Sequence, residues 1–190
     1  EVIAMDYIFV ARNVVQGTFG SNPAKSKFLE VPPAAKVHTP GMEIARAQWV
    51  KKVVAIGDTG KNAQGKPEGD VLIYIHGFNS EQSLILKRHR LIRKGLESLG
   101  YKGAVVSFDW PCADTALNYL EDRMDAKLTA LRLVSDAVVP FARALKEANP
   151  AVELTRTEFV GPSVGEELRD QSGVALLVSL GLMMAFVAVR

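Results

Sequence analysis

The chain has 190 residues, the size of one domain or of one domain with a short additional segment. Its 23 Lys and Arg against 21 Asp and Glu leave a net charge of +2, which excludes the strongly basic surface of a nucleic-acid-binding protein. Apolar residues make up 48%, enough for a core, and the single cysteine, Cys112, excludes a disulfide framework and a Cys-rich zinc site. His38, His76 and His89 lie on separate segments, so we expect no metal and no cofactor.

The first part of the chain is predicted to contain one strand, a long connector and one helix. Residues 5–12 (MDYIFVAR) have the length and apolar character of a strand, and the charge of Asp6 distinguishes them from a signal peptide. Residues 17–42 are rich in Gly, Pro and Ser, which predicts an irregular connector. Residues 43–56 are predicted to form a helix that runs into a strand, and residues 57–70 a polar loop.

The middle of the chain has a clear strand and a clear helix. Residues 71–75 (VLIYI) form a continuous apolar run, which is typical of a parallel strand buried on both faces. A helix is predicted over residues 81–99, with Ser80 as its N-cap and Gly100 as its stop.

Two kinds of side chain share this predicted helix. One apolar stripe at helical spacing consists of Leu84, Ile85, Leu91, Ile92, Leu96 and Leu99. Between these residues lies the run KRHR at 87–90, followed by Arg93 and Lys94. The basic residues are consistent with an anion-binding patch or with a solvated helix face, and the second interpretation is favoured because exposed helix faces are routinely charged.

The order of the remaining elements indicates the fold class. Residues 104–109 predict another buried strand, residues 114–148 a long helix that Pro140 should kink or split, and residues 152–160 a further strand. Strands therefore alternate with helices, which predicts an α/β fold with a parallel sheet and crossover helices.

A long apolar segment lies near the carboxyl end of the sequence. Residues 173–189 are 17 residues without a charge, the lower limit for a membrane span. Apolar residues lie all round this predicted helix, so it has no polar face. Two interpretations are open: a membrane-type helix, and a helix buried in a core.

Two short motifs could carry chemistry. His76, Gly77, Phe78 and Asn79 follow the strand at 71–75, where a loop could direct backbone N–H groups at an oxyanion; a plain strand-to-helix turn explains them equally well. Residues 161–165 (GPSVG) fit G-x-S-x-G between a predicted strand and a predicted helix. In that context Ser163 would be the nucleophile, and the N–H of Val164 would donate to the oxyanion.

The hydrolytic interpretation of Ser163 has a strong competitor. Ser163 and Glu166 also form a capping box, which alone accounts for a serine at a helix start. A triad in the α/β-hydrolase order needs a histidine after the serine, and no histidine follows Ser163 in this sequence. Cys112 could serve as a nucleophile with His76 as its base, although a small buried side chain is its ordinary role.

Longer stretches of the chain resemble a known family. The matching residues are MDYIFVARNV at 5–14, GDVLIYIHGFN at 69–79, GAVVSFDWP at 103–111 and ALNYLEDRMDAK at 116–127. From about residue 5 to 154 the chain resembles a bacterial family of uncharacterised α/β-hydrolase-fold proteins. The resemblance implies that residues 76–79 lie beside the active site and help to form the oxyanion hole. That family continues with a G-H-S-x-G type elbow, an acid and a histidine, and this sequence departs from it there.

The rest of the chain resembles a different family. Residues 157–190 (TEFVGPSVGEELRDQSGVALLVSLGLMMAFVAVR) are similar to the SecF-type protein-export membrane subunit, and through it to the SecD/SecF pair. The resemblance implies that Gly-Pro-Ser-Val-Gly is a structural entry to a membrane helix, with no hydrolytic role.

These observations predict a truncated α/β-hydrolase-like domain over residues 1–154 and a SecF-like segment over residues 155–190. The expected fold is a partial hydrolase-like parallel sheet that ends in a long apolar C-terminal helix. The first functional interpretation is a serine hydrolase or esterase for a small ester-type substrate, inactive as given because its triad is incomplete. The alternative is a non-enzymatic fragment of a protein-translocation subunit. A third is that two proteins, in nature or in sequence assembly, have been joined near residues 150–157.

The two resemblances lead to different expectations for location. The absence of a signal-peptide pattern predicts the cytoplasm, whereas residues 173–189 predict association with a membrane. Nucleic acid is not expected as a partner.

Overall fold

A computed structural model describes residues 4–61, 67–77, 80–112, 119–148 and 150. The chain divides into two units, Glu1–Glu153 and Leu154–Arg190, and the described residues lie in the first. The strand predicted over 152–160 and the apolar helix predicted over 173–189 lie outside the described residues, so both stay predictions. Within the described ranges, no helix has the length and apolar character needed to cross a membrane.

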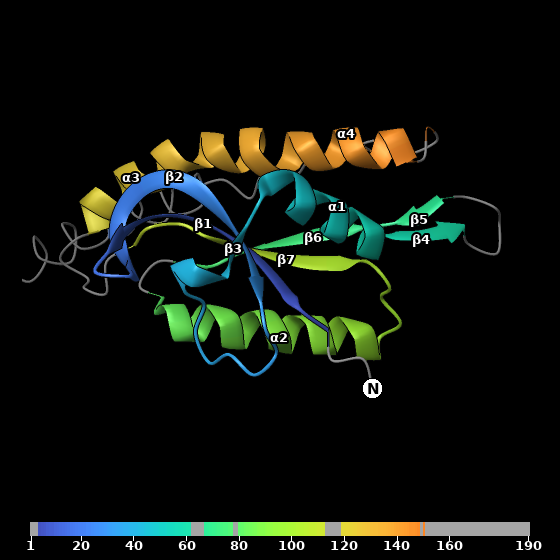
Figure 1. Ribbon diagram of the computed structural model, residues 1–190, viewed down its shortest axis with the longest axis horizontal. Helices are drawn as coiled ribbons and strands as arrows, with labels where there is room; N and C mark the ends of the chain where they lie inside the picture. Colours follow the sequence, from blue (N-terminus) through green and yellow to red (C-terminus); the bar gives the residue numbers. More distant parts are fainter. Residues whose placement is uncertain (1–3, 62–66, 78–79, 113–118, 149, 151–190) are drawn as a thin grey trace, which may run out of the picture. The chain divides into compact units, whose positions relative to one another are not determined.

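A five-stranded sheet forms the centre of the first unit (Figure 1). Its strands, in spatial order, are β3 (Glu43–Ile44), β2 (Thr18–Val31), β1 (Asp6–Val15), β7 (Ala104–Asp109) and β6 (Val71–Ile75). The strands β1, β7 and β6 are parallel, whereas β2 runs antiparallel to both β1 and β3. The α/β class and the strands predicted at 5–12, 71–75 and 104–109 are confirmed, but the sheet is mixed rather than wholly parallel.

The prediction of an irregular connector over 17–42 was wrong, because β2 occupies half of it. Gln16 and Gly17 have positive φ angles of 49° and 79°, which is the backbone of a two-residue hairpin turn between β1 and β2. Pro23 lies opposite Arg12, where the register of the two strands shifts, and such irregularities tolerate a residue without an N–H. The Gly and Pro content of this segment therefore marks a turn and a bulge in a hairpin.

Two further segments, residues 43–57 and residues 57–70, also differ from expectation. The short strand β3 precedes the helix α1 (Arg46–Gly57), which is the reverse of the predicted helix-then-strand order. The predicted polar loop at 57–70 includes a two-stranded sheet of β4 (Asp58–Lys61) and β5 (Pro67–Gly69). A 3-10 turn, η1 (Pro40–Met42), precedes β3.

Helices cover both faces of the sheet (Figure 1). The helix α2 (Gln82–Ser98) lies on one face and connects the neighbouring parallel strands β6 and β7. On the other face lie α1, α3 (Tyr119–Leu133), a π-helical turn η3 (Val134–Val138) and α4 (Val139–Ala148). Pro140 lacks the N–H that would bond to the carbonyl of residue 136 in an α-helix. The π-helical turn η3 contains residue 136 and ends at Val138, directly before the start of α4. The predicted interruption at Pro140 is confirmed.

The ends of α2 follow the prediction only at the carboxyl terminus. Gly100 has φ +86°. The N–H of Gly100 donates to the carbonyl of Glu97, and the N–H of Tyr101 donates to the carbonyl of Leu96, both at 3.0 Å. This is the Schellman arrangement, which favours glycine. The predicted Ser80 cap is wrong: the cap position is Glu81, and Ser80 Oγ instead accepts a hydrogen bond from Arg88.

Two apolar clusters hold the helices on the sheet. Alternate residues of β1 point to opposite faces, so Tyr7 and Phe9 pack toward α1 and α4, while Ile8 and Val10 join Leu86 of α2. The apolar stripe predicted for α2 is only partly buried. Ile85 is fully buried, whereas Leu84, Leu91 and Leu99 are exposed.

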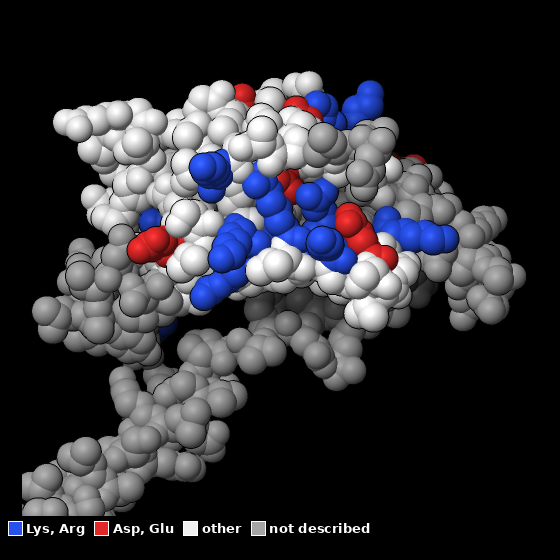
Figure 2. All heavy atoms as spheres, turned by 90° about the horizontal axis from the view of Figure 1, so that it is seen from below, with Lys and Arg blue, Asp and Glu red and all other residues white. Residues whose placement is uncertain are grey.

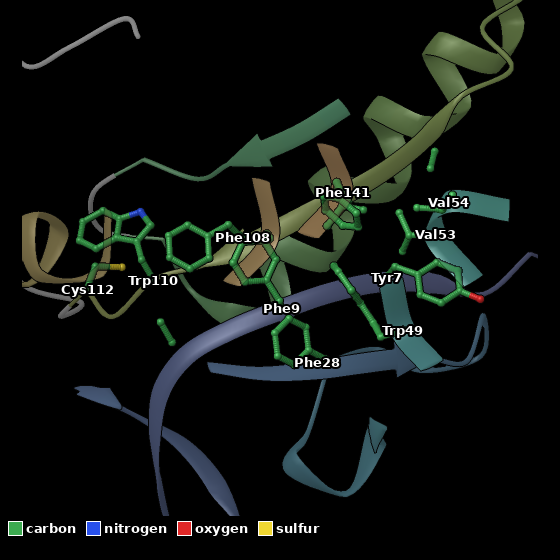
Figure 3. Close-up of a cluster of buried hydrophobic side chains, with 14 residues drawn as sticks. Tyr7, Phe9, Phe28, Trp49, Val53, Val54, Phe108, Trp110, Cys112 and Phe141 are labelled. Carbon is green, nitrogen blue, oxygen red and sulfur yellow. The ribbon is translucent and has the colours of Figure 1, made fainter. Parts of the chain in front are cut away.

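Trp49 of α1 lies at the centre of the larger cluster (Figure 3). Its side chain is fully buried, and its Nε1 donates to the carbonyl of Leu29 at 2.9 Å. The ring contacts Phe28 and Phe141 at centroid distances of 5.2 and 5.4 Å, so Trp49 joins α1, β2 and α4.

We expect Trp49→Ala to lower the free energy of unfolding by about 3–5 kcal/mol, because it opens a cavity and leaves a carbonyl of β2 unpaired. Leu91→Ala on the exposed face of α2 should change it by less than about 0.5 kcal/mol. Denaturant unfolding followed by far-ultraviolet circular dichroism measures both. Equal effects of the two substitutions would contradict the role assigned to Trp49.

Candidate functional site

The candidate site lies where three parallel strands reach their carboxyl ends. Asp109 is the last residue of β7, His76 directly follows β6, and Arg12 lies in β1 beyond its pairing with β7. In open α/β sheets, ligands bind at this edge. A fourth segment, the connector after β2, contributes His38. All four side chains are buried.

The carboxylate of Asp109 is the centre of this group. Arg12 Nε donates to Oδ1 at 2.6 Å, His38 Nε2 donates to Oδ2 at 2.7 Å, and His76 Nε2 donates to Oδ1 at 3.1 Å. Burial acts to raise the pKa of Asp109, but the hydrogen bonds from His38 and His76 and the charge of Arg12 hold that pKa well below its usual range. Asp109 is therefore a buried anion with three donors.

The two ring nitrogens of His76 both face acceptors. Nε2 lies against the carboxylate of Asp109, and Nδ1 lies 2.9 Å from the carbonyl oxygen of Gly77. Since neither partner can donate a proton, both nitrogens must carry one, and the ring is an imidazolium. Burial opposes this charge, but Asp109, Cys112 and the Gly77 carbonyl together raise the pKa of His76 to about 9.

Trp110 fixes the position of His76. The two rings stack at a centroid distance of 5.3 Å and an angle of 4°, and Trp110 Nε1 donates to the carbonyl of His76 at 2.8 Å. Close stacking on an indole also favours a cationic ring. His76 is thus a fixed cation at neutral pH, and beside the Cys112 thiol such a cation favours the thiolate form.

Cys112 belongs to the same polar group, at the end of the core beside Trp110 (Figure 3). Its Sγ lies 3.5 Å from Arg12 Nη2 and 3.7 Å from the carbonyl oxygen of Ser80. Burial acts to raise the pKa of the thiol, but His76, the Ser80 contact and Arg12 lower it overall. The sequence-based picture of an ordinary small core residue therefore missed the charged neighbours.

A second histidine cluster lies under α2. His89 Nδ1 lies 2.7 Å from Ser107 Oγ, and His89 Nε2 lies 3.5 Å from Asp6 Oδ1. These are the residue types of a serine triad, yet all three are fully buried between α2 and the sheet. Arg90 and Arg93 also reach Asp6, at 2.7 and 3.0 Å. The cluster anchors α2, and substrate cannot reach it.

Burial alone would raise the pKa of Asp6. The neighbouring His89, the hydrogen bond from Arg90 and the charge of Arg93 lower the pKa of Asp6 overall. The sequence analysis placed Asp6 in a strand and the basic residues in a helix, but no sequence signal linked them.

The oxyanion role predicted for residues 76–79 stays a prediction, and the structure describes only two of these residues. It brings His76 and Gly77 to the carboxyl edge of the sheet. Phe78, Asn79, Ser163 and Val164 lie outside the described residues, so their proposed roles stay predictions.

A groove of about 410 Å³ borders the Asp109 group at Arg12, and its other lining residues include Asn13, Ser26 and Glu43. Within the described ranges, no three His, Cys, Asp or Glu side chains are arranged to hold a metal ion. Arg12 already supplies a cation to Asp109 Oδ1. A groove of about 720 Å³ lies between α1 and α4, and its lining residues include Val50, Val139 and Arg143.

Comparisons with known proteins divide the chain into two regions. Residues 57–156 match the family described as alpha/beta hydrolase of unknown function (DUF900). Residues 140–190 match the family described as protein export membrane protein SecD/SecF, C-terminal. Both resemblances inferred from the sequence are confirmed. The two matches overlap, and α4 lies almost wholly within both.

The similar curated proteins are translocase subunits. The chain is 52% identical over 52 residues to protein translocase subunit SecF of Pseudomonas aeruginosa, which covers 26% of this chain and 17% of that protein. It is 50% identical over 40 residues to the SecF subunit of Vibrio alginolyticus, covering 21% and 13%. The chain thus spans less than a fifth of these relatives. No solved structure matches it.

The charged state of His76 makes stability depend on pH. A pKa of about 9 in the folded chain, against about 6.5 when unfolded, means that this stabilisation is complete below about pH 6.5 and lost as the pH rises through 9. The expected loss is on the order of 3 kcal/mol. The free energy of unfolding should be measured from pH 6 to 10.

The lowered pKa of Cys112 acts in the opposite sense, so both chains in this experiment carry Cys112→Ala. Because Cys112 also helps to raise the pKa of His76, the decline in this background should be smaller than with Cys112 present. The comparison variant adds His76→Gln, which cannot titrate and should remove the decline. A decline of the same size in the two chains would refute the assignment of an imidazolium to His76.

Proposed function

The chain belongs to the alpha/beta hydrolase family of unknown function (DUF900), and on that premise we propose that it carries a hydrolase scaffold for a small ester-type substrate without histidine-assisted serine catalysis. The scaffold is the sheet edge at the ends of β6 and β7. The proposed oxyanion loop is residues 76–79, with the N–H of Val164 as a second donor. Ser163 occupies the nucleophile position of the G-x-S-x-G motif, and we propose that it is inactive for lack of a base.

One observation carries the catalytic part of this proposal. The chain has three histidines, and all three are buried and engaged. His38 and His76 donate to Asp109, and His89 is held between Ser107 and Asp6. Among the described residues, His38 Nδ1 has no hydrogen-bond partner, but the His38 side chain is buried. No histidine follows Ser163, where the α/β-hydrolase order places the base, so we infer that a Ser-His-Asp triad in that order is incomplete in this chain.

The ester-type substrate is inferred from the family and from the charges at this edge. Hydrolysis of an ester passes through an oxyanion, which fixed donors and positive charge stabilise. Arg12 and His76 supply two cations against one carboxylate, Asp109, and the stack on Trp110 holds the start of the loop in place. These features support binding of a polarised carbonyl without supplying a base.

A fluorophosphonate probe tests the proposal, because it labels only serines that an adjacent base activates. We expect labelling of the full chain to stay at the level of its Ser163→Ala variant. The probe should label a known serine hydrolase under the same conditions, which serves as the positive control. Labelling that the Ser163→Ala substitution abolishes would show an active Ser163 and refute the proposal.

A second function is favoured by the match to SecF. The identity of 52% over 52 residues is high for so short a segment. We propose that residues 155–190 form a separate SecF-like segment that associates with a membrane through residues 173–189, and that a protein-export membrane subunit of the SecD type is its partner. In this role Ser163 would begin a helix and would not act on a substrate.

Extraction of membranes at alkaline pH tests this second function. The full chain should stay with the membrane pellet, because inserted apolar segments resist the wash. The matched variant Leu180→Lys/Met184→Lys should move to the supernatant, since each lysine near the centre of a span costs about 2.5–3.5 kcal/mol. An unsubstituted chain found wholly in the supernatant would contradict the proposed membrane role.

A further inference from the structure

The helix α2 presents different residues on its two sides. Toward the sheet it buries Ile85, Leu86 and His89. Arg90 and Arg93 also turn inward, where they pair with Asp6. These two arginines therefore do not explain the basic character of the outer side.

The outer side of α2 combines basic and aliphatic residues. We define the outward face of α2 as Leu84, Lys87, Arg88, Leu91 and Lys94, which recur at intervals of three or four residues and are all exposed. Leu91 is 61% exposed, so an aliphatic side chain lies on this face among the cations. Figure 2 views the unit from the side of α2 and shows Lys and Arg side chains gathered there.

A neighbouring loop extends this surface. The guanidinium of Arg90 donates to the carbonyls of Ala35 and Pro32 at 2.7 and 3.0 Å, which holds that loop against α2. The loop exposes Lys36 and Val37, again one cation beside one aliphatic side chain. The same pairing of charge and apolar surface therefore occurs on two segments that lie together.

We propose that the outward face of α2 docks on a membrane surface rich in anionic phospholipid. Lysine and arginine side chains would contact the phosphate headgroups, and Leu84 and Leu91 would enter the boundary with the acyl chains. Glu97 is the single acidic residue of α2, against the three basic residues of its outward face, so the charge of that face complements an anionic surface. This inference depends neither on the hydrolase site nor on residues 173–189.

Charge selects this occupant over two others. The apolar segment at 173–189 has no charged residue, so it could cover the leucines but would leave Lys87, Arg88 and Lys94 without counter-charges. A nucleic acid would satisfy the cations but offer nothing to Leu84 and Leu91. An anionic bilayer satisfies both kinds of side chain.

Flotation with vesicles tests the proposal, and every chain compared carries Leu180→Asp/Met184→Asp so that residues 173–189 do not insert. The vesicles are either pure phosphatidylcholine or a mixture of phosphatidylcholine and phosphatidylglycerol. Binding through α2 should require phosphatidylglycerol and weaken at high salt, whereas insertion of 173–189 would be insensitive to both. The variant K87Q/R88Q/K94Q should bind the mixed vesicles about a hundredfold more weakly, at about fivefold for each basic residue.

A matched control keeps the total charge equal. The variant K51Q/K127Q/K146Q removes three exposed lysines from α1, α3 and α4, on the other face of the sheet, and should bind as the chain that carries only Leu180→Asp/Met184→Asp does. A second variant, L84S/L91S, should bind more weakly while it keeps the requirement for phosphatidylglycerol. Equal binding to both vesicle types, or equal loss in the two triple variants, would overturn the proposal.

Discussion

The buried carboxylate of Asp109 joins four segments that are far apart in the sequence. Arg12 reaches it from β1, His38 from the connector after β2, and His76 from the end of β6. A carboxylate without these partners would be very costly to bury, and Arg12 and His76 would in turn be unpaired cations without the carboxylate. The carboxyl edge of the sheet can therefore form only as a unit.

This constraint also limits the chemistry of the edge. The contacts that make His76 a good partner for Asp109 and for the Gly77 carbonyl remove the lone pair that a general base requires. His89 shows the same conflict under α2, where it holds Ser107 and Asp6 in a dry interface. The three histidines of this chain are all buried in contacts that join separate segments of the fold.

The helix α2 illustrates how one segment can serve two surfaces. Its basic run seemed from the sequence to be a single solvated face. The structure divides it: Arg90 and Arg93 neutralise Asp6, whereas Lys87, Arg88 and Lys94 remain outside with Leu84 and Leu91. Only the second group is free to meet a partner, and its mixture of charge and apolar surface is that of an interfacial helix.

The sequence by itself determined the elements whose signals are local: the strands at 71–75 and 104–109, the helix that Gly100 ends, the interruption at Pro140, and both family resemblances. It failed at β2, since the pairing that makes residues 18–31 a strand lies on β1 and β3 and not within the segment. The candidate site could be predicted only as the loop at 76–79. Only the tertiary structure decided the contacts of the site. It brings His76, Arg12 and His38 to Asp109 and places Cys112 among charged side chains. These residues lie up to 100 positions apart in the sequence and meet only when the sheet assembles.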